Sequence, residues 1–366
     1  MDERSCWLSF SAYPAIGPAR FRKILEEFKT AKKAWPGTSR RLVKVMGEEL
    51  AAKFEEFRKE FSIEDYIEKL KEKDIWFMTL RDEGYPQLLQ EIRNPPFILY
   101  GRGQVPDGTW FSKSIAVVGA RRTTEYGREV TRFLTAELVA NGLTIVSGLA
   151  LGVDAISHMT ALENNGKTIA VLGCGVDCCN PAENQSLYNS ILESGNCIIS
   201  EFPLGMKPAK WTFPARNRII AGLSQAVLVT EGAEDSGSLI TADYAFKFNR
   251  KVFAVPGPIT SSMSKGPYKL IAKGAKLVTS AKDILEELKI TNLKSQAPNK
   301  SQNIKFKTAT EDELKILKLL ENENLHFDEI VRKTKFTSSR LGVTLSLMEI
   351  KGMVKSLDGG MFGLAT

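Results

Sequence analysis

Hydrophobic residues near the start of the chain recur at intervals of three or four positions. Phe21, Ile24, Leu25 and Phe28 show this spacing, which places their side chains on one face of a helix. A similar pattern continues to about residue 75, so we expect an N-terminal helical domain over residues 1–75.

Short, continuous apolar runs replace this pattern between residues 76 and 290. Each run is rich in β-branched residues and is followed by a glycine or polar turn and then by a helix-like segment. Continuous apolar runs are typical of parallel strands, because helices cover both faces of a parallel sheet. The pattern predicts a Rossmann-like, doubly wound, mostly parallel α/β domain. The clearest predicted strands are Ser114–Val118, Thr144–Ser147, Thr168–Leu172, Cys197–Ser200, Ala226–Thr230, Lys251–Val255 and Ala275–Val278.

The C-terminal region has a third pattern. Residues 291–308 are polar and have little to bury, which predicts a linker. Three helix-like segments follow, and Asp358-Gly-Gly360 lies between two short apolar pieces, as in a hairpin turn. Three helices and a hairpin indicate a winged helix over residues 309–366, which would bind either duplex DNA or a protein.

Composition adds a few limits. The 366 residues suggest two or three domains, and the formal net charge of +7 is a weak indication of a polyanionic partner. We find neither an apolar run long enough for a membrane span nor a signal-peptide pattern, so we expect a cytoplasmic protein. An odd number of cysteines favours reduced thiols, and Cys174, Cys178 and Cys179 lie far from either histidine in sequence, so no metal site is predicted.

The first candidate motif follows the strand predicted at 114–118. Ligands of doubly wound sheets bind at the carboxyl ends of the strands, where Gly119 permits close backbone approach and the amides of the next helix attract an anion. The patterns of dinucleotide and P-loop sites are absent, so no nucleotide cofactor is expected. Arg121 and Arg122 would crowd a pyrophosphate but suit the phosphates of an extended strand. The alternative is that one of these arginines forms an ion pair within the fold.

The second motif follows the strand predicted at 144–147. Ser147 and Gly148 are small enough to leave room for a ligand, and Asp154 is a candidate helix cap. His158 lies one turn later, without a catalytic partner in view, and we interpret it as a packed core residue.

The third and fourth motifs add cations and hydroxyls to the same edge of the sheet. Lys210, Arg216 and Arg218 are interleaved with Trp211 and Phe213 just before an apolar helix. The arginines predict phosphate contacts, whereas the aromatic rings either stack on bases or simply pack in the loop. The run of residues 236–238, Ser-Gly-Ser, precedes another helix and predicts a second anion site, with a plain helix cap as the alternative.

With these residues identified, the chain resembles the DprA/Smf family of DNA-processing proteins. The matching motifs occur in family order: Gly119-Ala-Arg-Arg122, Ser147-Gly-Leu-Ala-Leu-Gly-Val-Asp154, Leu172-Gly-Cys-Gly-Val-Asp177, Asn180-Pro-Ala-Glu-Asn184, Ser200-Glu-Phe-Pro203, Phe213-Pro-Ala-Arg-Asn-Arg-Ile-Ile-Ala221, Ser236-Gly-Ser-Leu-Ile-Thr-Ala242 and Val255-Pro-Gly257. The N-terminal Ile16-Gly-Pro-Ala-Arg20 is similar to the family's helix-hairpin-helix (SAM-like) region. Cys178 and Cys179 depart from the family, whose members often have an aromatic residue there.

The resemblance implies a non-catalytic protein that protects single-stranded DNA during natural transformation and helps to load the RecA recombinase. It also implies a homodimer, with Phe246, Tyr268 and Leu277 as candidate interface residues and core packing as the alternative. Together, the motifs and the resemblance predict these DNA-binding residues: Gly119, Arg121, Arg122, Ser147, Gly148, Lys210, Arg216, Asn217, Arg218, Ser236, Gly237 and Ser238.

Two other functions remain possible at this point. A nucleotide hydrolase of the lysine-decarboxylase-like group has a similar layout, but Thr241 stands where those enzymes have an acidic residue, and Asp243 is displaced along the helix. A winged-helix regulator would account for residues 309–366 and leave the basic edge of the sheet unused.

Overall fold

The computed structural model describes residues 1–290, 310–320, 323–351 and 353–364. Residues 1–291 and 292–366 form separate compact units, and the predicted linker at 291–308 lies outside the described residues. No helix in the described ranges has both the length and the apolar composition needed to cross a bilayer.

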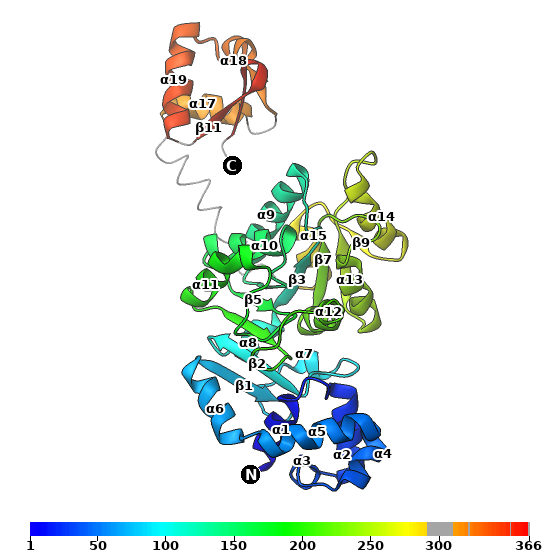
Figure 1. Cartoon of the computed structure of the whole chain (residues 1–366). Coiled ribbons are helices and arrows are strands. Elements are labelled where there is room, and N and C mark those ends of the chain that lie inside the picture. The colour runs from blue at the N-terminus through cyan, green and yellow to red at the C-terminus, as the bar shows by residue number, and fades with distance from the viewer. Residues whose placement is uncertain (291–309, 321–322, 352, 365–366) are drawn as a thin grey trace. The chain divides into compact units, whose positions relative to one another are not determined.

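The first unit begins with a cluster of helices (Figure 1). They pack around aromatic side chains, as the apolar spacing predicts. Phe10 and Phe54 stack with ring centroids 5.4 Å apart, and both are fully buried. The helices are α1 (Glu3–Ser11), α2 (Pro18–Phe28), α3 (Ala31–Ala34), α4 (Ser39–Met46), α5 (Glu48–Glu60) and α6 (Ile63–Glu72).

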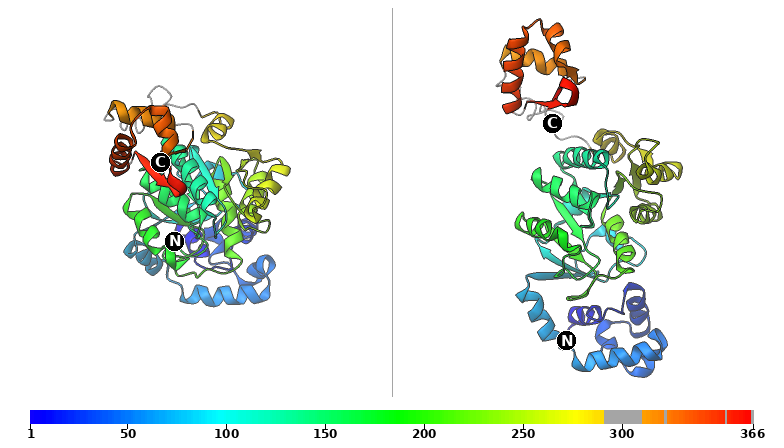
Figure 2. Two further views of the ribbon diagram at one scale, coloured as in Figure 1. Left: turned by 90° about the horizontal axis from the view of Figure 1, so that it is seen from above. Right: turned by 45° about the horizontal axis from the view of Figure 1, so that its top comes forward.

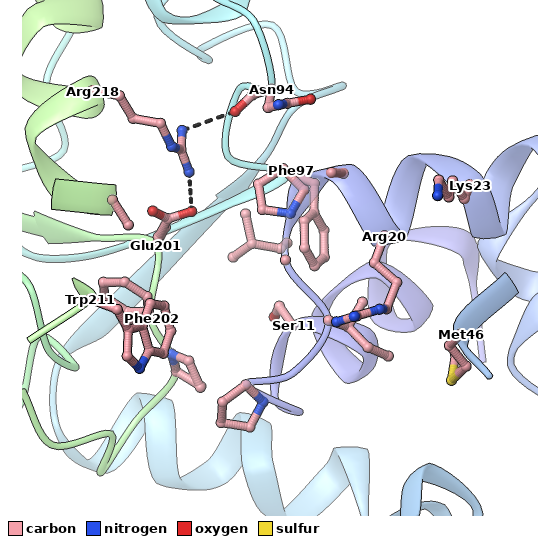
Figure 3. Close-up of a pocket in the computed structure, with 18 of the residues that line it drawn as sticks. Ser11, Arg20, Lys23, Met46, Asn94, Phe97, Glu201, Phe202, Trp211 and Arg218 are labelled. Atoms are coloured by element: carbon pink, nitrogen blue, oxygen red, sulfur yellow. Dashed lines mark hydrogen bonds and ion pairs between the residues drawn. The ribbon is translucent and has the colours of Figure 1, made fainter. Parts of the chain in front are cut away.

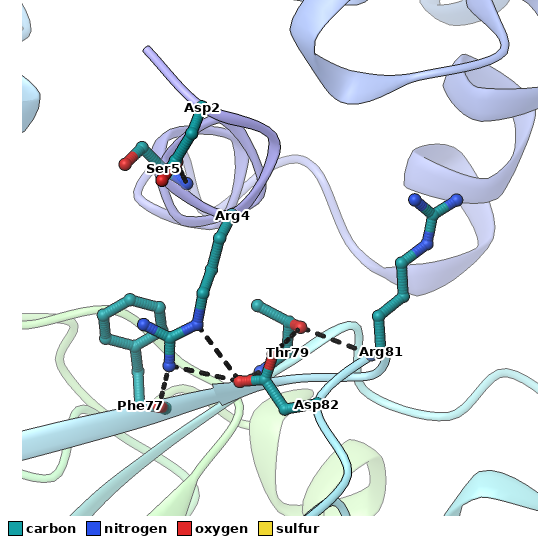
Figure 4. Close-up of polar contacts among 7 residues, drawn as sticks. All are labelled: Asp2, Arg4, Ser5, Phe77, Thr79, Arg81 and Asp82. Carbon is teal, nitrogen blue, oxygen red and sulfur yellow. Dashed lines mark hydrogen bonds and ion pairs between the residues drawn. The ribbon is translucent and has the colours of Figure 1, made fainter.

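These helices share a core with the edge of the sheet. Phe97 stacks on Phe21 of α2 with a centroid distance of 4.0 Å. Figure 4 shows a polar connection beside this core: Arg4 Nη2 of α1 donates to Asp82 Oδ2 (3.1 Å) and to the Phe77 carbonyl (3.0 Å). The helical segment is therefore joined to the sheet by packing and by hydrogen bonds.

Within the described residues the main sheet has nine strands in the order β1-β2-β6-β5-β4-β3-β7-β8-β9. The strands from β3 to β9 are parallel to one another, whereas β1 and β2 are antiparallel additions, with β2 paired to β6, that the apolar runs do not reveal. The strands are β1 (Ile75–Thr79), β2 (Ile98–Gly103), β3 (Ser114–Val118), β4 (Thr144–Ser147), β5 (Thr168–Val171), β6 (Cys197–Ser200), β7 (Ala226–Val229), β8 (Lys251–Ala254) and β9 (Lys276–Leu277).

Helices cover both faces of this sheet (Figures 1 and 2), which explains why the central strands are buried throughout. The connecting helices are α7 (Gln87–Gln90), α8 (Gly108–Ser112), α9 (Glu125–Ala140), α10 (Val153–Glu163), α11 (Gln185–Glu193), α12 (Thr212–Leu223), α13 (Ser238–Lys247), α14 (Lys265–Ala272) and α15 (Ala281–Glu287). The strand order reverses between β3 and β7, so the loops after these two strands diverge at their carboxyl ends. That divergence opens a space for a ligand.

The second unit is a winged helix. Helices α17 (Glu311–Leu320), α18 (Phe327–Thr334) and α19 (Ser338–Ile350) pack on a small sheet whose order is β10-β12-β11. The strands are β10 (Leu325–His326), β11 (Val354–Leu357) and β12 (Met361–Leu364), and the predicted turn at 358–360 joins the last two.

The aromatic contact between the helices and the sheet yields a stability prediction. We expect Phe97→Ala to lower the free energy of unfolding by about 3–5 kcal/mol, because the 6% exposed ring leaves a cavity against Phe21. Phe133→Ala removes a ring that is 53% exposed and should cost less than about 0.5 kcal/mol. Urea unfolding followed by circular dichroism compares the two variants. Equal losses of unfolding free energy would contradict a core shared by the helices and the sheet.

Candidate nucleic-acid interface

A cleft of about 570 Å³ lies at the carboxyl edge of the sheet, where the strand order reverses. The loop after β3, the residues leading into α12 with its first turns, and the segment that begins α13 form its walls. Most of the predicted DNA-binding residues come together here: Gly119, Arg121, Arg122, Lys210, Arg216, Asn217, Ser236, Gly237 and Ser238 line the cleft.

Three cations at the cleft are exposed. Arg121, Arg122 and Lys210 take part in none of the ion pairs formed within the described residues. The Arg121 guanidinium lies 5.4 Å from the centroid of the Phe213 ring, which supports its side chain without neutralising it. The alternative of an internal ion pair therefore finds no support at these arginines, and their charge remains available to an anion.

Arg216 is instead buried, at 4% exposure, and its hydrogen bonds connect elements that surround the cleft. Its Nη1 donates to the carbonyls of Gly148 and Val171, which follow β4 and end β5. Its Nε donates to Asn217 Oδ1 at 3.1 Å. A Cβ atom on Gly148 would lie 2.4 Å from Nη1, so only glycine leaves room for this guanidinium.

Burial also affects the ionisable groups beside Arg216. It raises the pKa of the Asp154 carboxyl, and the Arg216 charge opposes that rise. Asp154 accepts hydrogen bonds from the amides of Gly148 (3.2 Å) and Ala150 (3.3 Å), which fixes the loop that leads into α10.

Ser147 and Gly148 lie behind the cleft and do not line it. Ser147 is fully buried, and its hydroxyl donates to the Val117 carbonyl of the neighbouring strand at 2.7 Å. The small size of these two residues serves the packing around Arg216, and a direct contact with DNA remains only a prediction from the sequence.

Arg218 is placed elsewhere, which corrects the expectation that it lines the same edge. Residues two positions apart on an α-helix are separated by about 200° around the helix axis, so Arg216 and Arg218 point to opposite sides of α12. Arg218 forms an ion pair with Glu201 and donates to the Asn94 carbonyl at 2.9 Å. It lines a second cavity instead.

The two serines of the fourth motif bond to each other, with their Oγ atoms 2.8 Å apart. Ser236 Oγ also accepts from the Ser238 amide at 3.4 Å, at the start of α13, whose first turn lines the cleft. Asn217 Nδ2 donates to the Gly237 carbonyl at 3.3 Å and so ties α12 to this turn. The amides of Leu239 and Ile240 donate to the carbonyls of Ser236 and Gly237, so the first amides of α13 have partners within the chain, contrary to the expectation of free amides there.

The start of α9 is already occupied, contrary to the expectation that its free amides attract an external anion. The Glu231 carboxylate accepts from the Thr124 amide (2.9 Å) and hydroxyl (2.6 Å). A Cβ atom on Gly127 would lie 2.1 Å from Glu231 Oε2, so this glycine admits the carboxylate. Glu231 was not singled out from the sequence, since nothing there distinguishes it from Glu234 and Asp235.

Gly119 fits closely between two elements. A Cβ atom there would lie 2.6 Å from Val153 Cγ2 and 2.7 Å from the Glu231 carbonyl. The residue is therefore needed for the packing of α10 against the loops after β3 and β7.

The candidate interface residues for a dimer differ in exposure. Leu277 is 47% exposed on β9, the last strand of the sheet. Phe246 packs partly against the core, and Tyr268 is half-buried and donates to the Gly257 carbonyl. In the described part of the chain, no three histidine, cysteine or acidic side chains are grouped as metal ligands.

The fold and the site define a class: a Rossmann-like protein with a basic cleft at the strand-order reversal, carrying a separate winged helix. Sequence comparison extends this. The family model of the DNA recombination-mediator protein A matches residues 76–289, and that of the DprA winged helix domain matches residues 302–360. The chain belongs to the DprA/Smf family.

Curated relatives agree with the assignment. Protein Smf of Synechocystis sp. is 39% identical over 298 residues, which cover 78% of this chain and 73% of the relative. DNA processing protein DprA of Bacillus subtilis is 43% identical over 230 residues, covering 62% and 76%.

Solved structures with this fold include two DprA proteins. That of Streptococcus pneumoniae has a TM-score of 0.65 at 36% identity and covers 77% of this chain and 95% of its own. That of Helicobacter pylori, described for its single-stranded DNA binding mode, has a TM-score of 0.50 at 31% identity and covers 58% and 95%.

His158 allows a test of the site's acid–base chemistry. It is fully buried, its Nδ1 lies 2.6 Å from Thr168 Oγ1, and burial with the nearby Arg216 charge lowers its pKa to about 3. We expect its NMR resonances not to titrate between about pH 5 and pH 8, whereas an unfolded histidine takes a proton near about 6.5. Acidification from about pH 6.5 towards 3 should therefore destabilise the fold. Titration of His158 near neutrality would contradict this burial.

Proposed function

We propose that this protein binds and protects single-stranded DNA in the cleft, without catalysing a reaction. Arg121, Arg122 and Lys210 hold successive phosphates, and residues 236–238 at the start of α13 line the cleft beside the same strand. Contacts of this kind read the backbone and not the bases, so the cleft itself has little sequence preference.

The observation that carries the proposal is the contrast between cations that are engaged by other groups of the protein and cations that are exposed without an ion pair in the described residues. Arg216 and Arg218 are buried and engaged, whereas Arg121, Arg122 and Lys210 are exposed at the cleft without an ion pair in the described residues. Exposed positive charges around a cleft favour a polyanion. The single-stranded DNA binding described for the Helicobacter pylori relative supports the same assignment.

The family assignment supports a finer proposal. The protein acts in the cytoplasm during natural transformation, and passes its DNA to the RecA recombinase. We further propose a homodimer that uses β9, where Leu277 is exposed on the edge of the sheet, with Phe246 and Tyr268 nearby in the same part of the chain. The domain organisation expected from the sequence is also part of the proposal: a helical domain over 1–75, a Rossmann-like domain over 76–290, a linker over 291–308 and a winged helix over 309–366.

Substitution of the two exposed arginines tests the DNA site. We expect Arg121→Ala and Arg122→Ala each to weaken binding of oligo(dT) roughly tenfold at low salt, because each removes a charge-assisted phosphate contact. Each should also flatten the log–log salt slope by about 0.7.

Arg132→Ala provides a matched control, because Arg132 is an exposed arginine on α9 that does not line the cleft. Fluorescence anisotropy across a salt series measures both quantities, and circular dichroism checks the fold. Unchanged binding in the Arg121/Arg122 double variant would refute the proposed site.

The absence of a reaction is tested with small nucleotides. Thr241 lines the cleft at the position that is acidic in lysine-decarboxylase-like hydrolases, and the nearby Asp243 forms an ion pair with Lys273 at 2.6 Å. We therefore expect no release of base when the protein is incubated with nucleoside monophosphates and the mixture is separated by chromatography. Release that scales with protein and is lost in Asp243→Asn would favour the hydrolase instead.

A further inference from the structure

Three of the five cysteines lie in one turn after β5, and the proposed DNA-binding function uses none of them. Cys174 is buried at 1% exposure, whereas Cys178 and Cys179 are partly exposed, and all three are free thiols. They pack around the same small core, together with residues of β5, β6 and α11. The fold thus brings together thiols that differ in their access to solvent.

Cys174 and Cys178 are the pair whose side chains meet. The Cys178 amide donates to the Gly175 carbonyl at 3.0 Å, which turns the chain back, and the Cys174 thiol donates to the Cys178 carbonyl at 3.1 Å. Burial raises the pKa of the Cys174 thiol, and the adjacent Cys178 thiol, which shares a side-chain hydrogen bond with it, raises that pKa further. Because an S–S bond is about 2.05 Å long, a disulfide between these hydrogen-bonded thiols needs only a small closure of the turn.

Cys179 is bonded elsewhere. Its thiol donates to the Pro181 carbonyl at 3.3 Å. Burial raises the pKa of this thiol to about 11, with the neighbouring Cys178 adding to the rise. Little of Cys179 is therefore present as the thiolate, which is the form that attacks a disulfide.

The turn is bonded to the segment that leads into the DNA cleft. The Gly175 amide donates to the Met206 carbonyl at 2.9 Å, and Asp177 Oδ1 accepts from the Gly205 amide at 3.0 Å. These two hydrogen bonds hold the backbone of the segment that connects β6 to α12.

That segment carries side chains at both cavities. Lys210 lines the DNA cleft. Trp211 and Phe202 line the second cavity, of about 480 Å³, which lies beside the N-terminal helices (Figure 3). The backbone position of the segment therefore affects where the Lys210 ammonium group lies.

The turn also packs against the start of α12. A Cβ atom on Gly173 would lie 3.2 Å from Phe213 Cδ1 and 3.3 Å from Thr212 Oγ1, so little space separates the backbone of the turn from these residues. The Phe213 ring in turn supports the Arg121 guanidinium at 5.4 Å. A displacement at Cys174 therefore acts on residues that position the cations of the cleft.

We propose that Cys174 and Cys178 form a modification site, which a low-molecular-weight disulfide such as glutathione disulfide converts into a reversible intramolecular disulfide that weakens DNA binding. Formation of the S–S bond draws the turn away from its partners at residues 205, 206 and 213, so Lys210 is no longer held at the cleft. The inference rests on the proposed function for the effect on DNA and adds a control by oxidation to it.

The chemistry is two successive thiol–disulfide exchanges. Because Cys178 is partly exposed and Cys174 is buried, the Cys178 thiolate attacks first and releases one glutathione. The Cys174 thiolate then attacks the Cys178 sulfur of the mixed disulfide and releases the second glutathione. The two protein thiols are oxidised, their protons pass to the two glutathione thiolates, and one glutathione disulfide is reduced.

Peptide mapping of the full-length protein tests the modification. After incubation with glutathione disulfide and alkylation of the remaining thiols, a protease that cleaves before aspartate separates Cys174 from Cys178 at Asp177. We expect mass spectrometry to find the two peptides joined, and to find them separate after dithiothreitol. Cys178→Ser should abolish the link, whereas Cys179→Ser, the matched control in the same turn, should retain it.

DNA binding tests the consequence. We expect the oxidised wild-type protein to bind oligo(dT) about 3- to 10-fold more weakly, with a salt slope flatter by about 0.7, because the Lys210 phosphate contact is lost. Dithiothreitol should restore both quantities. Lys210→Ala should show the same flatter slope when reduced, and its oxidation should change the slope little further. Cys178→Ser should not respond to the oxidant, whereas Cys179→Ser should respond as the wild type does.

Unlinked Cys174 and Cys178 after exposure to glutathione disulfide would overturn the inference, and so would a Cys174–Cys178 disulfide that leaves the affinity for oligo(dT) unchanged. The proposed function would survive either result, because the reduced protein would still bind DNA. Failure of the reduced protein to bind oligo(dT) at low salt would instead refute the proposed function, and with it the effect of oxidation on DNA binding.

Discussion

The buried Arg216 guanidinium is the contact on which the candidate site depends. It bonds carbonyls at the ends of two adjacent strands, at Gly148 and Val171, and thereby fixes α12 across the carboxyl edge of the sheet. A buried charge is costly unless its donors are satisfied, so these carbonyls stabilise the arginine as much as it positions them. Every other residue that α12 brings to the two cavities depends on this anchor.

The same helix explains how one sequence motif supplies two different environments. Residues that follow one another alternate between the cleft and the second cavity, because α12 and the residues leading into it form the wall between them. Charge separates the environments further: Lys210 faces the cleft unpaired within the described residues, whereas Arg218 is neutralised by Glu201. Whether a carboxylate lies beside a cation therefore indicates the role of that cation better than its place in the motif does.

Much of the fold could be predicted from the sequence. The strands from β3 to β8 are short apolar runs, most of them with β-branched residues, and a parallel sheet covered by helices favours that composition. The antiparallel β1 and β2 were missed, since β1 is half-buried in places and both belong to the core shared with the N-terminal helices.

The candidate site could be predicted less completely. Arg121 and Arg122 were expected at this edge because they follow a predicted strand, and Lys210 because it precedes an apolar helix; all three line the cleft. The orientation of Arg218 depends on its contact with Asn94, and the role of Glu231 depends on its contact with Thr124. Both contacts join residues more than 100 positions apart in the sequence, which periodicity does not reveal. The sequence singled out Gly148 as a small residue, but it does not reveal that Gly127 and Gly148 make room for side chains from distant segments.

The acidic and basic groups near the cleft favour binding over chemistry. Glu231 is engaged by the first turn of α9, Asp154 holds the loop before α10, and His158 is buried against Thr168. Each of these groups has a structural partner that a proton-transfer role would disrupt, since a general acid or base must reach its substrate. Asp154 also lines the cleft, but it is 7% exposed and bonded to the amides of Gly148 and Ala150. The exposed cations there are guanidinium and ammonium groups, which suit the retention of phosphates.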